Sequence, residues 1–498
     1  MKNRLKVLII TEGGSGMGFG HIVRCVSVCE ALAERGVLAE LIINGDGAVS
    51  DLCKNIKSRR ILNWLKNSKM LFECIQGADI AIIDSYLAPL NFYNKISRAV
   101  KTPVFFDDEK RLDYPRGIVI NGAVYADKLR YRGKKNMAYL LGPCFIPLRK
   151  EFRGVAGKKI GKKVKRIMIT FGGDDPKNMT SKVLKILVES YPPLVKNVVI
   201  GKGFKNRDEI IKFSDGKTRL IDRPDAAGMK KIMSSSDMAI SGGGQTLYEL
   251  AMTGVPTISV LVADNQLNNI VGLVRAGVVK YAGKWNSRFL KRSIKKCVCG
   301  LQNVNTRKRM SLAGKETVDG LGAVRIAKVC IERYLKENLV VKNAGPGDLM
   351  DVYKLSNDRE IRSRSFNTEK IGLDEHKGWF RGKIEDDNCL FLIARLKGKF
   401  LGQIRFDKND SGMVVNLSIA ECYRGSGVGR VFMDKALSHV MERSPSVRFI
   451  KAFVKKDNIP SRGFFENAGF GNNGITSVKD VKAIEYSLDL KKIRKGIV

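Results

Sequence analysis

The sequence predicts an α/β chain in three parts, of which two are built on parallel sheets and the third mixes helices with antiparallel strands. The length of 498 residues allows about three domains, at roughly 100–200 residues each. Short apolar runs alternate with helical patterns in the first two parts, which favours parallel, doubly wound sheets. Closely spaced strand patterns in the third part favour antiparallel pairing. We expect the parts to cover residues 1–155, 156–336 and 337–498.

The first part opens with an apolar run that predicts a buried strand at residues 7–10. A glycine-rich loop follows at residues 13–21, and a helical pattern then covers residues 22–35 and ends before Gly36. Further strands are expected at residues 38–43, 78–83 and 104–106. This alternation of strand and helix is typical of a doubly wound lobe.

The second part follows a basic, glycine-containing stretch at residues 150–166, which indicates a hinge. Its strands are expected at residues 166–171, 198–200, 238–240 and 255–260. The third part starts near residue 339, with strand patterns at residues 389–396, 399–407 and 413–419. Residues 397–399 predict a hairpin turn between the first two of these strands.

The chain is strongly basic, with 89 Lys and Arg against 50 Asp and Glu and a formal net charge of +39. Such a balance is compatible with nucleic-acid binding. The basic residues are scattered, however, and neither a helix-turn-helix, zinc-finger or RNP-type motif nor interleaved aromatic residues accompany them. We therefore expect small phosphate-bearing substrates and no nucleic acid, because a positive field attracts polyanions of any kind.

Cysteine and histidine usage predicts no metal site. The ten Cys form no C-x-x-C pair, and the chain has only three His: His21, His376 and His439. Scattered thiols, and an apolar run at residues 5–10 that is too short for a secretory signal, favour the reducing cytoplasm. No run approaches the ~18 apolar residues of a membrane span, so no membrane association is expected.

The first candidate site lies at the end of the glycine-rich loop, where His21 starts the predicted helix. Arg24 follows about one turn later on the same side. The positive end of the helix disfavours a charge on the imidazole, and a neutral ring can accept a proton from water as a general base. A capping or structural role for His21 fits the same pattern equally well.

A second glycine-rich turn, at residues 241–246, follows the strand expected at residues 238–240. Glycines there let the backbone approach a diphosphate, and the helix behind them favours negative charge. Thr246 can supply a hydroxyl, and Glu249, one turn into the helix, can accept hydrogen bonds from ribose hydroxyls. A tight turn with a solvated glutamate is the structural alternative.

These motifs belong to an ordered set. The set consists of Gly18-Phe19-Gly20-His21-Ile22-Val23-Arg24, Ile83-Asp84-Ser85-Tyr86, Leu141-Gly142-Pro143 with residues 148–152, residues 171–176, residues 242–246 with Glu249, and Asn265-Gln266. In this order the N-terminal parts resemble the UDP-sugar hydrolase of pseudaminic acid biosynthesis, a relative of the GT-B glycosyltransferases. The resemblance implies a GT-B-like pair of Rossmann-type lobes.

The same resemblance implies that water attacks the anomeric carbon of a UDP-linked 2,4-diacetamido-2,4,6-trideoxy sugar with inversion, and that UDP leaves without help from a metal. It implies that His21 is the catalytic residue, as the base or as the group that orients the water. The substrate-binding residues that it implies are Gly20, Arg24, Asp84, Tyr86, Gly173, Gly243, Gly244, Gln245, Thr246, Glu249, Asn265 and Gln266. A glycosyltransferase is the close alternative, because a fold does not choose the acceptor.

The third part carries another glycine-rich turn, Arg424-Gly425-Ser426-Gly427-Val428-Gly429, between the strand at 413–419 and a helix expected at 430–441. Backbone N–H groups in such a turn, backed by a helix N-terminus, suit the diphosphate of CoA. A further strand, expected at 449–454, is followed by a spaced set that matches N-x-x-S-x-x-F-F-x-x-x-G-F: Asn458, Ser461, Phe464, Phe465, Gly469 and Phe470.

Together these motifs resemble the GNAT acetyltransferases, and the third part is expected to have their α+β fold. The resemblance implies acetyl-CoA as co-substrate. The residues that it implies for binding acetyl-CoA are Ile419, Arg424, Gly425, Ser426, Gly427, Val428, Gly429, Asn458, Ser461 and Phe465. Many enzymes of this family have Tyr in place of Phe465, and the phenol reprotonates the CoA thiolate, so Ser461 or a water would have to supply that proton here.

On the acceptor side, Glu375-His376 with Trp379-Phe380 resembles a segment of sugar-nucleotide N-acetyltransferases. This resemblance implies that His376 binds substrate or relays the amine proton. A histidine on the surface of a helix is an equally good interpretation.

The two resemblances together imply a bifunctional cytoplasmic enzyme of pseudaminic acid biosynthesis. The third part would acetylate the 4-amine of a UDP-4-amino-4,6-dideoxy-N-acetylhexosamine, and the first two would remove UDP from the product. Consecutive steps on one chain raise the local concentration of the intermediate, and other enzymes of the pathway could be partners. The alternatives are a GT-B-like glycosyltransferase of a surface polysaccharide fused to an acetyltransferase for another amino sugar, and a basic nucleic-acid-associated protein whose GNAT domain acetylates protein or RNA.

Overall fold

The structure, a computed structural model, describes residues 5–14, 17–131, 133–409 and 412–494. Ser15 and Gly16 of the expected glycine-rich loop lie outside the described residues. The chain divides into two compact units, Met1–Cys330 and Ile331–Val498. Each unit is described by itself.

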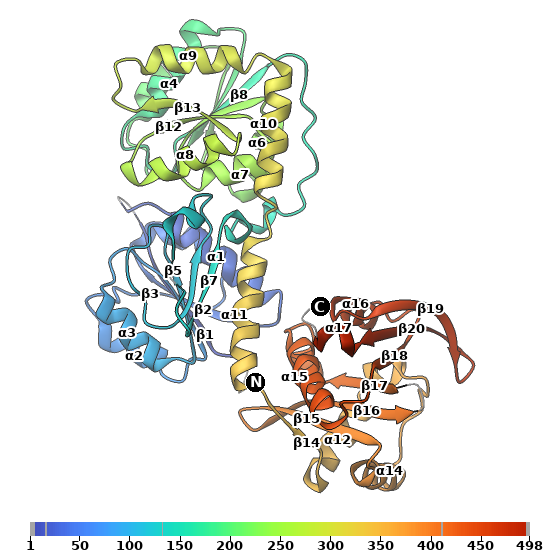
Figure 1. Ribbon diagram of the computed structural model, residues 1–498. Helices are drawn as coiled ribbons and strands as arrows, with labels where there is room; N and C mark the ends of the chain where they lie inside the picture. The colour runs from blue at the N-terminus through green and yellow to red at the C-terminus, as the bar shows by residue number, and fades with distance from the viewer. Residues whose placement is uncertain (1–4, 15–16, 132, 410–411, 495–498) are drawn as a thin grey trace. The chain divides into compact units, whose positions relative to one another are not determined.

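The N-terminal unit begins with a parallel sheet of seven strands in the order β3-β2-β1-β4-β5-β6-β7. The strands are β1 (Val7–Glu12), β2 (Ala39–Asn44), β3 (Arg59–Ile61), β4 (Ile80–Asp84), β5 (Thr102–Phe106), β6 (Gly117–Asn121) and β7 (Met137–Leu141). Helices α1 (Gly20–Ala33), α2 (Ser68–Ile75) and α3 (Leu90–Ala99) cover its two faces (Figure 1). Short 3₁₀ turns at Gly47–Cys53, Ala126–Leu129, Pro143–Phe145 and Lys150–Phe152 complete this lobe.

A second parallel sheet follows in the same unit, with six strands in the order β10-β9-β8-β11-β12-β13. Its strands are β8 (Arg166–Thr170), β9 (Val195–Ile200), β10 (Thr218–Asp222), β11 (Met238–Gly242), β12 (Thr257–Leu261) and β13 (Val279–Lys284). Its helices are α4 (Met179–Ser190), α5 (Arg207–Lys212), α6 (Ala226–Ser235), α7 (Thr246–Met252), α8 (Leu267–Arg275), α9 (Leu290–Gly300) and α10 (Val304–Thr317). A 3₁₀ turn at Asp264–Gln266 precedes α8.

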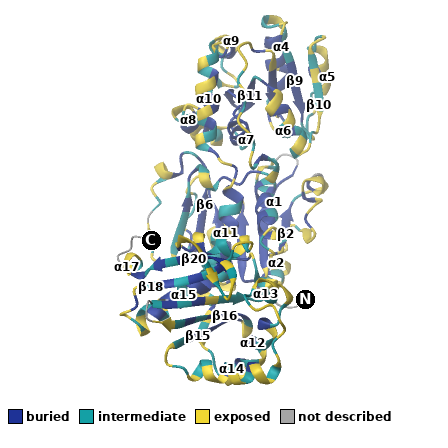
Figure 2. Cartoon of the chain, turned by 90° about the vertical axis from the view of Figure 1, so that its right-hand side faces the viewer, coloured by how far each residue is buried: buried dark blue, intermediate teal, exposed yellow. Residues whose placement is uncertain are grey.

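Both sheets have the burial pattern of strands covered on two faces. All six residues of β1 and all five of β4 and β12 are buried, as expected when helices cover both sides. Figure 2 shows the buried residues concentrated in the strands. The strand order reverses between β1 and β4 in the first sheet and between β8 and β11 in the second. Ligands of doubly wound sheets bind at the carboxyl ends of the strands at such switch points.

The C-terminal unit contains one seven-stranded sheet in the order β14-β15-β16-β17-β18-β20-β19. Its strands are β14 (Val340–Asn343), β15 (Cys389–Leu396), β16 (Lys399–Asn409), β17 (Gly412–Ile419), β18 (Phe449–Lys455), β19 (Gly471–Val478) and β20 (Val481–Asp489). Its helices are α12 (Leu349–Ser356), α13 (Arg359–Arg364), α14 (Leu373–Glu385), α15 (Val428–Arg443), α16 (Ile459–Asn467) and α17 (Leu490–Arg494), while α11 (Gly322–Asn338) contains the boundary between the units. Two 3₁₀ turns lie at Pro346–Asp348 and Glu421–Tyr423.

One pair of strands in this sheet departs from the antiparallel pattern. β17 and β18 are parallel, and their register joins only Met413 to Ile450 and Val414 to Lys451. The later residues of β17 therefore have no partner in β18 among the paired residues of the described chain. An unpaired strand edge of this kind can accept an extended ligand through its backbone groups.

The expected hairpin between β15 and β16 is confirmed. Lys397 and Gly398 both have positive φ, 51° and 76°, and the two strands pair antiparallel from Leu396 and Lys399 onward. Two central residues with positive φ define the turn type whose twist matches that of paired strands.

The structure also adds strands that the sequence analysis does not predict: β3, β6, β7, β10, β13, β19 and β20. All three residues of β3 are exposed, and β10 has no fully buried residue, so neither carries an apolar run. In addition α1 begins at Gly20 rather than at residue 22, which places His21 inside its first turn.

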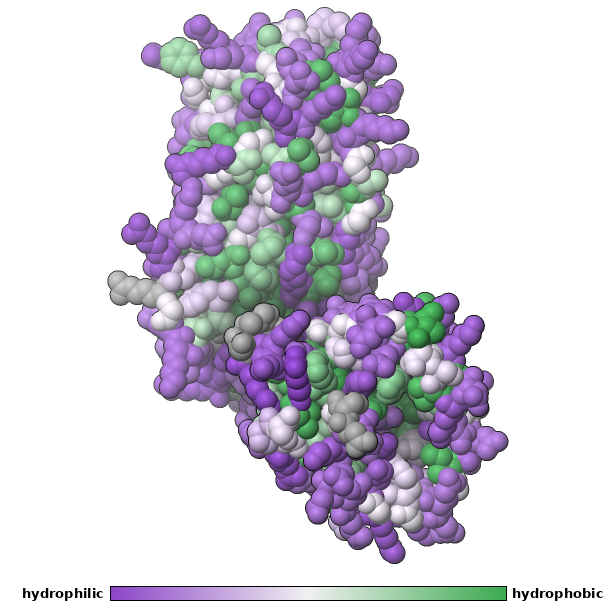
Figure 3. All heavy atoms as spheres, turned by 45° about the vertical axis from the view of Figure 1, so that its right-hand side comes forward, coloured by the Kyte–Doolittle hydropathy of each residue, from purple (hydrophilic) through white to green (hydrophobic). Residues whose placement is uncertain are grey.

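The outer surface is mainly hydrophilic, as the large share of charged residues in the composition leads us to expect. In Figure 3 hydrophilic residues dominate the face in view, and hydrophobic residues form small separate patches. Within the described residues, no helix combines the length and the apolar character needed to cross a bilayer.

Candidate active sites

The first candidate site lies at the switch point of the first sheet. His21 is in the first turn of α1, and Asp84 is the last residue of β4. The Nδ1 atom of His21 lies 2.6 Å from Oδ1 of Asp84. The predicted residues Gly20, His21, Arg24, Asp84 and Tyr86 therefore gather at one edge of the sheet.

The contacts of Nδ1 define the tautomer of His21. A carboxylate only accepts hydrogen bonds, so a separation of 2.6 Å from Asp84 requires a proton on Nδ1. Nη2 of Arg24 lies 3.0 Å from Nδ1, but a guanidinium only donates, so this approach is not a hydrogen bond. In the neutral ring Nε2 then carries the lone pair on the other side, as a general base requires.

Asp84 is the centre of this arrangement and is only 1% exposed. Arg24 donates to both of its oxygens, from Nε to Oδ2 at 2.5 Å and from Nη2 to Oδ1 at 2.5 Å. Burial alone would raise the pKa of Asp84, but Arg24 and then His21 outweigh burial and hold this pKa well below its ordinary value. Asp84 is therefore an ionised carboxylate that orients the imidazole and the guanidinium together.

Asp108 joins the site from the segment after β5, although the sequence analysis does not select it. Nη1 of Arg24 lies 2.9 and 2.8 Å from its two oxygens, and the Tyr86 hydroxyl donates to Oδ2 at 2.7 Å. The Tyr86 ring stands edge-on to the His21 ring, with centroids 4.6 Å apart. Asp107-Asp108 directly follows the strand that pairs with β4, but this position is recognisable as part of the site only once the pairing of the two strands is known.

Glu12, the last residue of β1, shapes the loop that carries Tyr86. It is 3% exposed and accepts hydrogen bonds from the Ser85 hydroxyl at 2.5 Å and from the backbone N–H of Tyr86 at 2.7 Å. A third bond comes from the N–H of Leu87 at 3.2 Å. These bonds fix the backbone around Tyr86, so its ring position beside His21 is determined by the sheet.

The loop before α1 also contacts the loop after β8. A Cβ atom added at Gly173 would lie 2.9 Å from the ring of Phe19, which is the residue before Gly20. The Phe19 ring therefore rests directly on the Gly173 backbone. This contact links His21 to the first glycine-rich loop of the second sheet.

At the switch point of the second sheet, the turn after β11 is held from behind by α8 and the segment before it. Oε1 of Gln266 accepts from the N–H of Gly243 at 2.9 Å, and Nδ2 of Asn269 donates to the carbonyl of Gly243 at 2.6 Å. A Cβ at Gly243 would lie 2.7 Å from Ile270, whereas Gly244 faces open space. The turn thus leaves Gly244 and the N-terminus of α7 accessible to an anion.

The remaining predicted residues of this turn point in different directions. Nε2 of Gln245 donates to the carbonyl of Pro147 at 2.7 Å. Glu249 is 4% exposed and accepts two hydrogen bonds from Arg149, at 2.8 and 2.9 Å. Thr246 is half-buried, and Asn265 is exposed. The sequence analysis includes Arg149 in a resembling segment but gives it no role.

The second candidate site is the glycine-rich turn between β17 and α15. Gly425 and Gly427 have positive φ, 75° and 89°, which favours glycine at both positions. A Cβ at Gly429 would lie 3.2 Å from the ring of Phe464, so α16 packs against the start of α15. N–H groups in the first turn of α15 lack intrahelical partners and can bind an anion, and the Val428 side chain is buried behind them.

Three residues predicted to bind CoA use their side chains in contacts within the protein. Arg424 donates to the carbonyl of Ile419 at 2.9 Å, to Asp358 at 2.8 Å and to Glu360 at 2.5 Å. Oδ1 of Asn458 accepts from the N–H of Ser461 at 3.3 Å, which caps α16. The Ser426 hydroxyl likewise donates to the carbonyl of Tyr423 at 2.5 Å. These side chains shape the turn rather than face out of it.

Phe465, which the resemblance implies for binding acetyl-CoA, lies in the core. Its ring is 6% exposed and packs against Phe470 and Tyr486, with ring centroids 5.1 and 6.2 Å away. The neighbouring Phe464 contacts the glycine-rich turn instead. One helical position is a rotation of about 100°, so adjacent residues face different partners.

His376 also lies away from the turn. It is 1% exposed and sits among the rings of Tyr353, Trp379 and Phe380. Burial lowers its pKa, which favours the neutral ring. His376 lies on the apolar face of its helix, which packs against the core. This placement gives no support to the predicted substrate contact.

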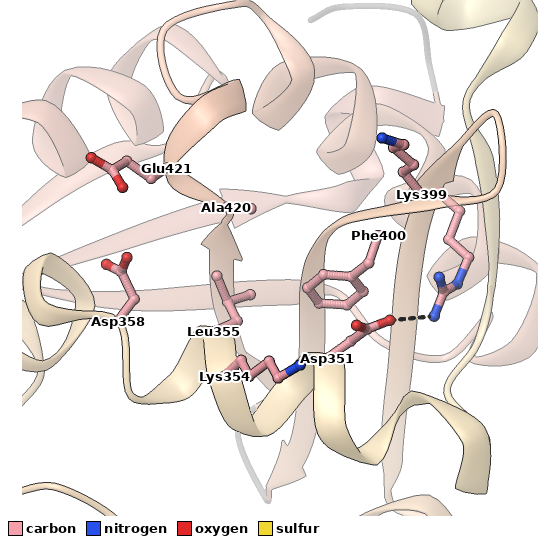
Figure 4. Close-up of a pocket in the computed structure, with 9 residues that line it drawn as sticks. Asp351, Lys354, Leu355, Asp358, Lys399, Phe400, Ala420 and Glu421 are labelled. Carbon is pink, nitrogen blue, oxygen red and sulfur yellow. Dashed lines mark hydrogen bonds and ion pairs between the residues drawn. The ribbon is translucent and has the colours of Figure 1, made fainter. Parts of the chain in front are cut away.

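A cavity of about 480 Å³ lies beside the second site, between α12 and the ends of β16 and β17 (Figure 4). It is lined by Asp351, Lys354, Leu355, Asp358, Arg395, Lys399, Phe400, Ala420 and Glu421. Arg395 pairs with Asp351 at 2.7 Å inside it, as the dashed line in Figure 4 marks. Phe400 and Leu355 lie between this pair and the carboxylates of Asp358 and Glu421 (Figure 4). Cys422, which follows Glu421 in the sequence, is exposed.

The class of each unit follows from fold and comparison together. The N-terminal unit holds two parallel Rossmann-like sheets. Residues 351–470 match the acetyltransferase (GNAT) family, so the C-terminal unit contains a GNAT acetyltransferase domain. The fold class predicted from the sequence is thereby confirmed.

Three known proteins are similar to the chain in sequence. It is 26% identical over 278 residues to the pseudaminic acid cytidylyltransferase and UDP-2,4-diacetamido-2,4,6-trideoxy-beta-L-altropyranose hydrolase of Helicobacter pylori, covering 53% of this chain and 46% of that one. It is 23% identical over 348 residues to the spore coat polysaccharide biosynthesis protein SpsG of Bacillus subtilis, covering 67% of this chain and 100% of SpsG. An uncharacterized protein of Methanocaldococcus jannaschii is 27% identical over 268 residues, which is 51% of this chain and 55% of that protein.

The predicted resemblance to the hydrolase is thus confirmed by a match to a protein of that name. The chain spans about half the length of the Helicobacter and Methanocaldococcus relatives, at 46% and 55%.

Proposed function

We propose that the chain is a bifunctional enzyme of nonulosonic acid biosynthesis, which acetylates a UDP-linked amino sugar and then removes UDP from the product by hydrolysis. The observation that carries the proposal is the buried Asp84 carboxylate on Nδ1 of His21, which leaves Nε2 as a base at the switch point of the first sheet. The name of the Helicobacter relative supports the sugar, UDP-2,4-diacetamido-2,4,6-trideoxyhexose.

In the hydrolytic step, Nε2 of His21 takes a proton from a water as the water oxygen attacks the anomeric carbon. The bond from that carbon to the diphosphate oxygen breaks on the opposite face, so the configuration inverts and UDP leaves. Asp84 keeps Nδ1 protonated and stabilises the imidazolium that forms, as an orienting carboxylate does in other His-based sites. Arg24 and Tyr86, both held by Asp108, border the sugar.

The leaving diphosphate would rest on the turn after β11. Gly244, Thr246 and the N-terminus of α7 supply N–H groups and a favourable dipole where negative charge develops. Gly243 and Gln266 keep the turn open. Glu249 would accept from ribose hydroxyls through the lone pairs that Arg149 leaves unused, with Gln245, Asn265 and Gly173 along the same edge.

In the acetyl-transfer step, the diphosphate of acetyl-CoA would lie on the N–H groups of Gly425, Gly427 and Gly429 at the start of α15. The open edge of β17 near Ile419 would pair with the amides of the pantetheine arm. The amine nitrogen attacks the thioester carbon and forms the C–N bond, the C–S bond breaks, and a water takes the proton that the amine loses. Since Phe465 is apolar and buried, Ser461 or a water supplies the proton that the thiolate takes up.

We place the amino-sugar acceptor against the cavity beside this turn. Asp358 and Glu421 lie near one end of it, which suits an ammonium group, and Lys354 and Lys399 suit phosphate. We further propose that residues 1–155 and 156–336 form GT-B-like lobes and that residues 337–498 form the acetyltransferase, all in the cytoplasm and without a metal.

A glycosyltransferase is the second candidate for the N-terminal unit. The match over the full length of SpsG favours it, because that relative is named for polysaccharide biosynthesis. Hydrolysis needs only water, whereas transfer needs a second sugar or another acceptor.

The test supplies the purified chain with a UDP-4-amino-4,6-dideoxy-N-acetylhexosamine, with and without acetyl-CoA. Release of free CoA thiol, and of UDP only when acetyl-CoA is present, is the expected result. Thiol without UDP would keep the acetyltransferase and favour the glycosyltransferase candidate. Release of neither product would overturn the proposal for this sugar.

A further inference from the structure

α13, a helix of six residues, connects the ends of the two strands that diverge in the C-terminal unit. β17 leads into the glycine-rich turn at Arg424, and β18 leads into the cap of α16 at Asn458. Past Met413 and Val414, no pairing within the described residues joins these strands. The separation of their ends must therefore be fixed by something other than the sheet.

The first end of α13 is bound to the turn after β17. Asp358, which caps α13 by accepting from the N–H of Ile361 at 3.1 Å, also accepts from Arg424 at 2.8 Å. Glu360 accepts from the same guanidinium at 2.5 Å. Since Arg424 also donates to the carbonyl of Ile419, this contact includes the last residue of β17.

The second end of α13 is bound to the segment after β18. Nη1 of Arg364 donates to Oδ1 of Asn458 at 3.3 Å. Nζ of Lys455, the last residue of β18, donates to the carbonyl of Ser363 at 3.4 Å. Both contacts lie where the sequence predicts one side of a CoA arm.

One ion pair along α13 joins these two ends. Glu360 and Arg364 are four positions apart, and Nη2 of Arg364 lies 2.7 Å from Oε1 of Glu360. The route from β17 to α16 is therefore continuous: Ile419, Arg424, Glu360, Arg364, Asn458 and Ser461. Each residue in this series binds the next one through its polar atoms. The series therefore acts as a spacer between the two strand ends rather than as a set of free ligands.

We propose that Glu360 and Arg364 are positioning residues of the acetyltransferase, which hold the ends of β17 and β18 at the separation that CoA requires. The inference rests on the proposed function, because it assumes that CoA lies between those ends. It also reassigns Arg424 from a ligand of the diphosphate to the anchor of this spacer. Without the spacer the two ends can drift apart, and the contacts on either side of CoA no longer form together.

The test measures binding of CoA alone to the full-length chain by isothermal titration calorimetry. Glu360→Gln and Arg364→Gln should each weaken the Kd for CoA by about three- to fivefold, the scale expected for one exposed ion pair. The double variant should be no weaker than the worse single variant, because both changes break the same route. Arg364→Lys should recover part of the affinity.

Arg333→Gln is the matched control. Arg333 and Glu337 form an ion pair four positions apart on α11, with side chains 38% and 41% exposed, close to the 40% and 45% of Arg364 and Glu360. This variant should bind CoA as the wild type does. In steady state, Glu360→Gln should raise KM for acetyl-CoA by the same factor and leave KM for the amine unchanged.

The outcomes separate the inference from the function on which it rests. Equal CoA affinity in the wild type and the two α13 variants would overturn the spacer while keeping the acetyltransferase. If Arg333→Gln weakened CoA binding by the same factor, the spacer would also be overturned, because the loss of any exposed ion pair would then reduce the affinity for CoA. A wild type that binds no CoA would overturn both.

Discussion

At the scale of the residue, Asp84 organises the first candidate site. A single buried carboxylate accepts from the imidazole and twice from the guanidinium, so it determines the positions of both at once. Asp108 performs a similar task one strand away by holding Arg24 and Tyr86. The five side chains form a preorganised edge, and the proposed chemistry depends on its geometry.

His21→Ala should lower UDP release by about a hundredfold to ten-thousandfold, the usual contribution of a positioned base. Acetyl transfer should continue unchanged, because the change lies in the other compact unit. UDP release and thiol release measured on the same preparation test this expectation. Loss of both activities would instead indicate misfolding or a wrong assignment.

Asp84→Asn should destabilise the protein by about 3 kcal/mol at pH 7, because Nε and Nη2 of the buried Arg24 lose their charged partner and keep only the Asp108 contacts of Nη1. The folded pKa of Asp84 lies below the unfolded value of about 3.9. Its stabilisation is therefore complete above that value and is lost as the pH falls through the folded pKa. In urea unfolding, the difference in free energy of unfolding between the wild type and Asp84→Asn should be smaller near pH 3 than at pH 7.

Asp51→Asn serves as the control for that titration. Asp51 is paired with Lys202, but its side chain is 77% exposed. Removing it should change stability little at either pH. If the difference in free energy of unfolding between the wild type and Asp84→Asn grew in acid, the assignment of Asp84 as an ionised partner would be contradicted.

Much of the candidate site was predictable residue by residue. The motifs containing His21, Arg24, Asp84 and Tyr86 converge because parallel strands end at one edge. Sequence reasoning missed Asp108, since a pair of aspartates after a strand carries no spacing signal of its own. It also gave no indication that Phe464 contacts the glycine-rich turn while Phe465 packs in the core, because a family motif gives positions along a helix but not the partners of two adjacent rings.

At the scale of the element, the turn between β17 and α15 depends on backbone shape. Gly427 caps α15 with φ of 89°, a conformation that costs other residues roughly 1 kcal/mol or more. Gly427→Glu adds this strain and a negative charge where a diphosphate is proposed. It should abolish use of acetyl-CoA and leave UDP release from an already acetylated sugar unchanged.

The matched control is Gly378→Ala within α14. Gly378 meets no neighbour within 4 Å, and alanine favours helix, so both activities should persist. Preserved CoA turnover in Gly427→Glu would show that the turn does not hold the co-substrate. Thiol release assayed with both variants decides the matter.

The contact between two loops of the N-terminal unit gives another prediction. Gly173→Val would drive the Phe19 ring away, since a Cβ there would lie 2.9 Å from it. UDP release should fall by about tenfold to a hundredfold as the adjoining His21 shifts. The double variant Gly173→Val with Phe19→Ala should recover most of that loss relative to Gly173→Val alone. If the second change brought no recovery, Gly173 would contact substrate directly instead.

Elements differ in how well the sequence predicts them, and burial explains the difference. β1 and β4 are fully buried, and each contains four consecutive apolar residues, at 7–10 and 80–83. β3 and β10 are largely exposed edge strands, so their pairing is decided by their neighbours and leaves no periodic signal. The divergence of β17 from β18 also has no sequence signal, because it is a property of two strands far apart in the chain.

At the scale of the whole molecule, the two compact units imply two sites that can fail independently. A mixture of the His21→Ala chain and the Gly427→Glu chain should regain UDP release that depends on acetyl-CoA. The first chain acetylates the sugar, and the second hydrolyses what the first releases. A time course of UDP should show a lag that shortens as the first chain is increased. No recovery, with both single activities present, would contradict a freely released intermediate.

The exposed thiol of Cys422 has a practical consequence. It lies two residues before Arg424, on the turn proposed to bind the co-substrate, whereas Cys25, Cys29, Cys53 and Cys330 are buried. Cys144 and Cys299 are the other exposed thiols in the described chain. With those two replaced by serine, a maleimide dye would attach chiefly beside the turn. The protein would then carry its own fluorescent reporter of nucleotide occupancy, at a position that the native sequence already provides.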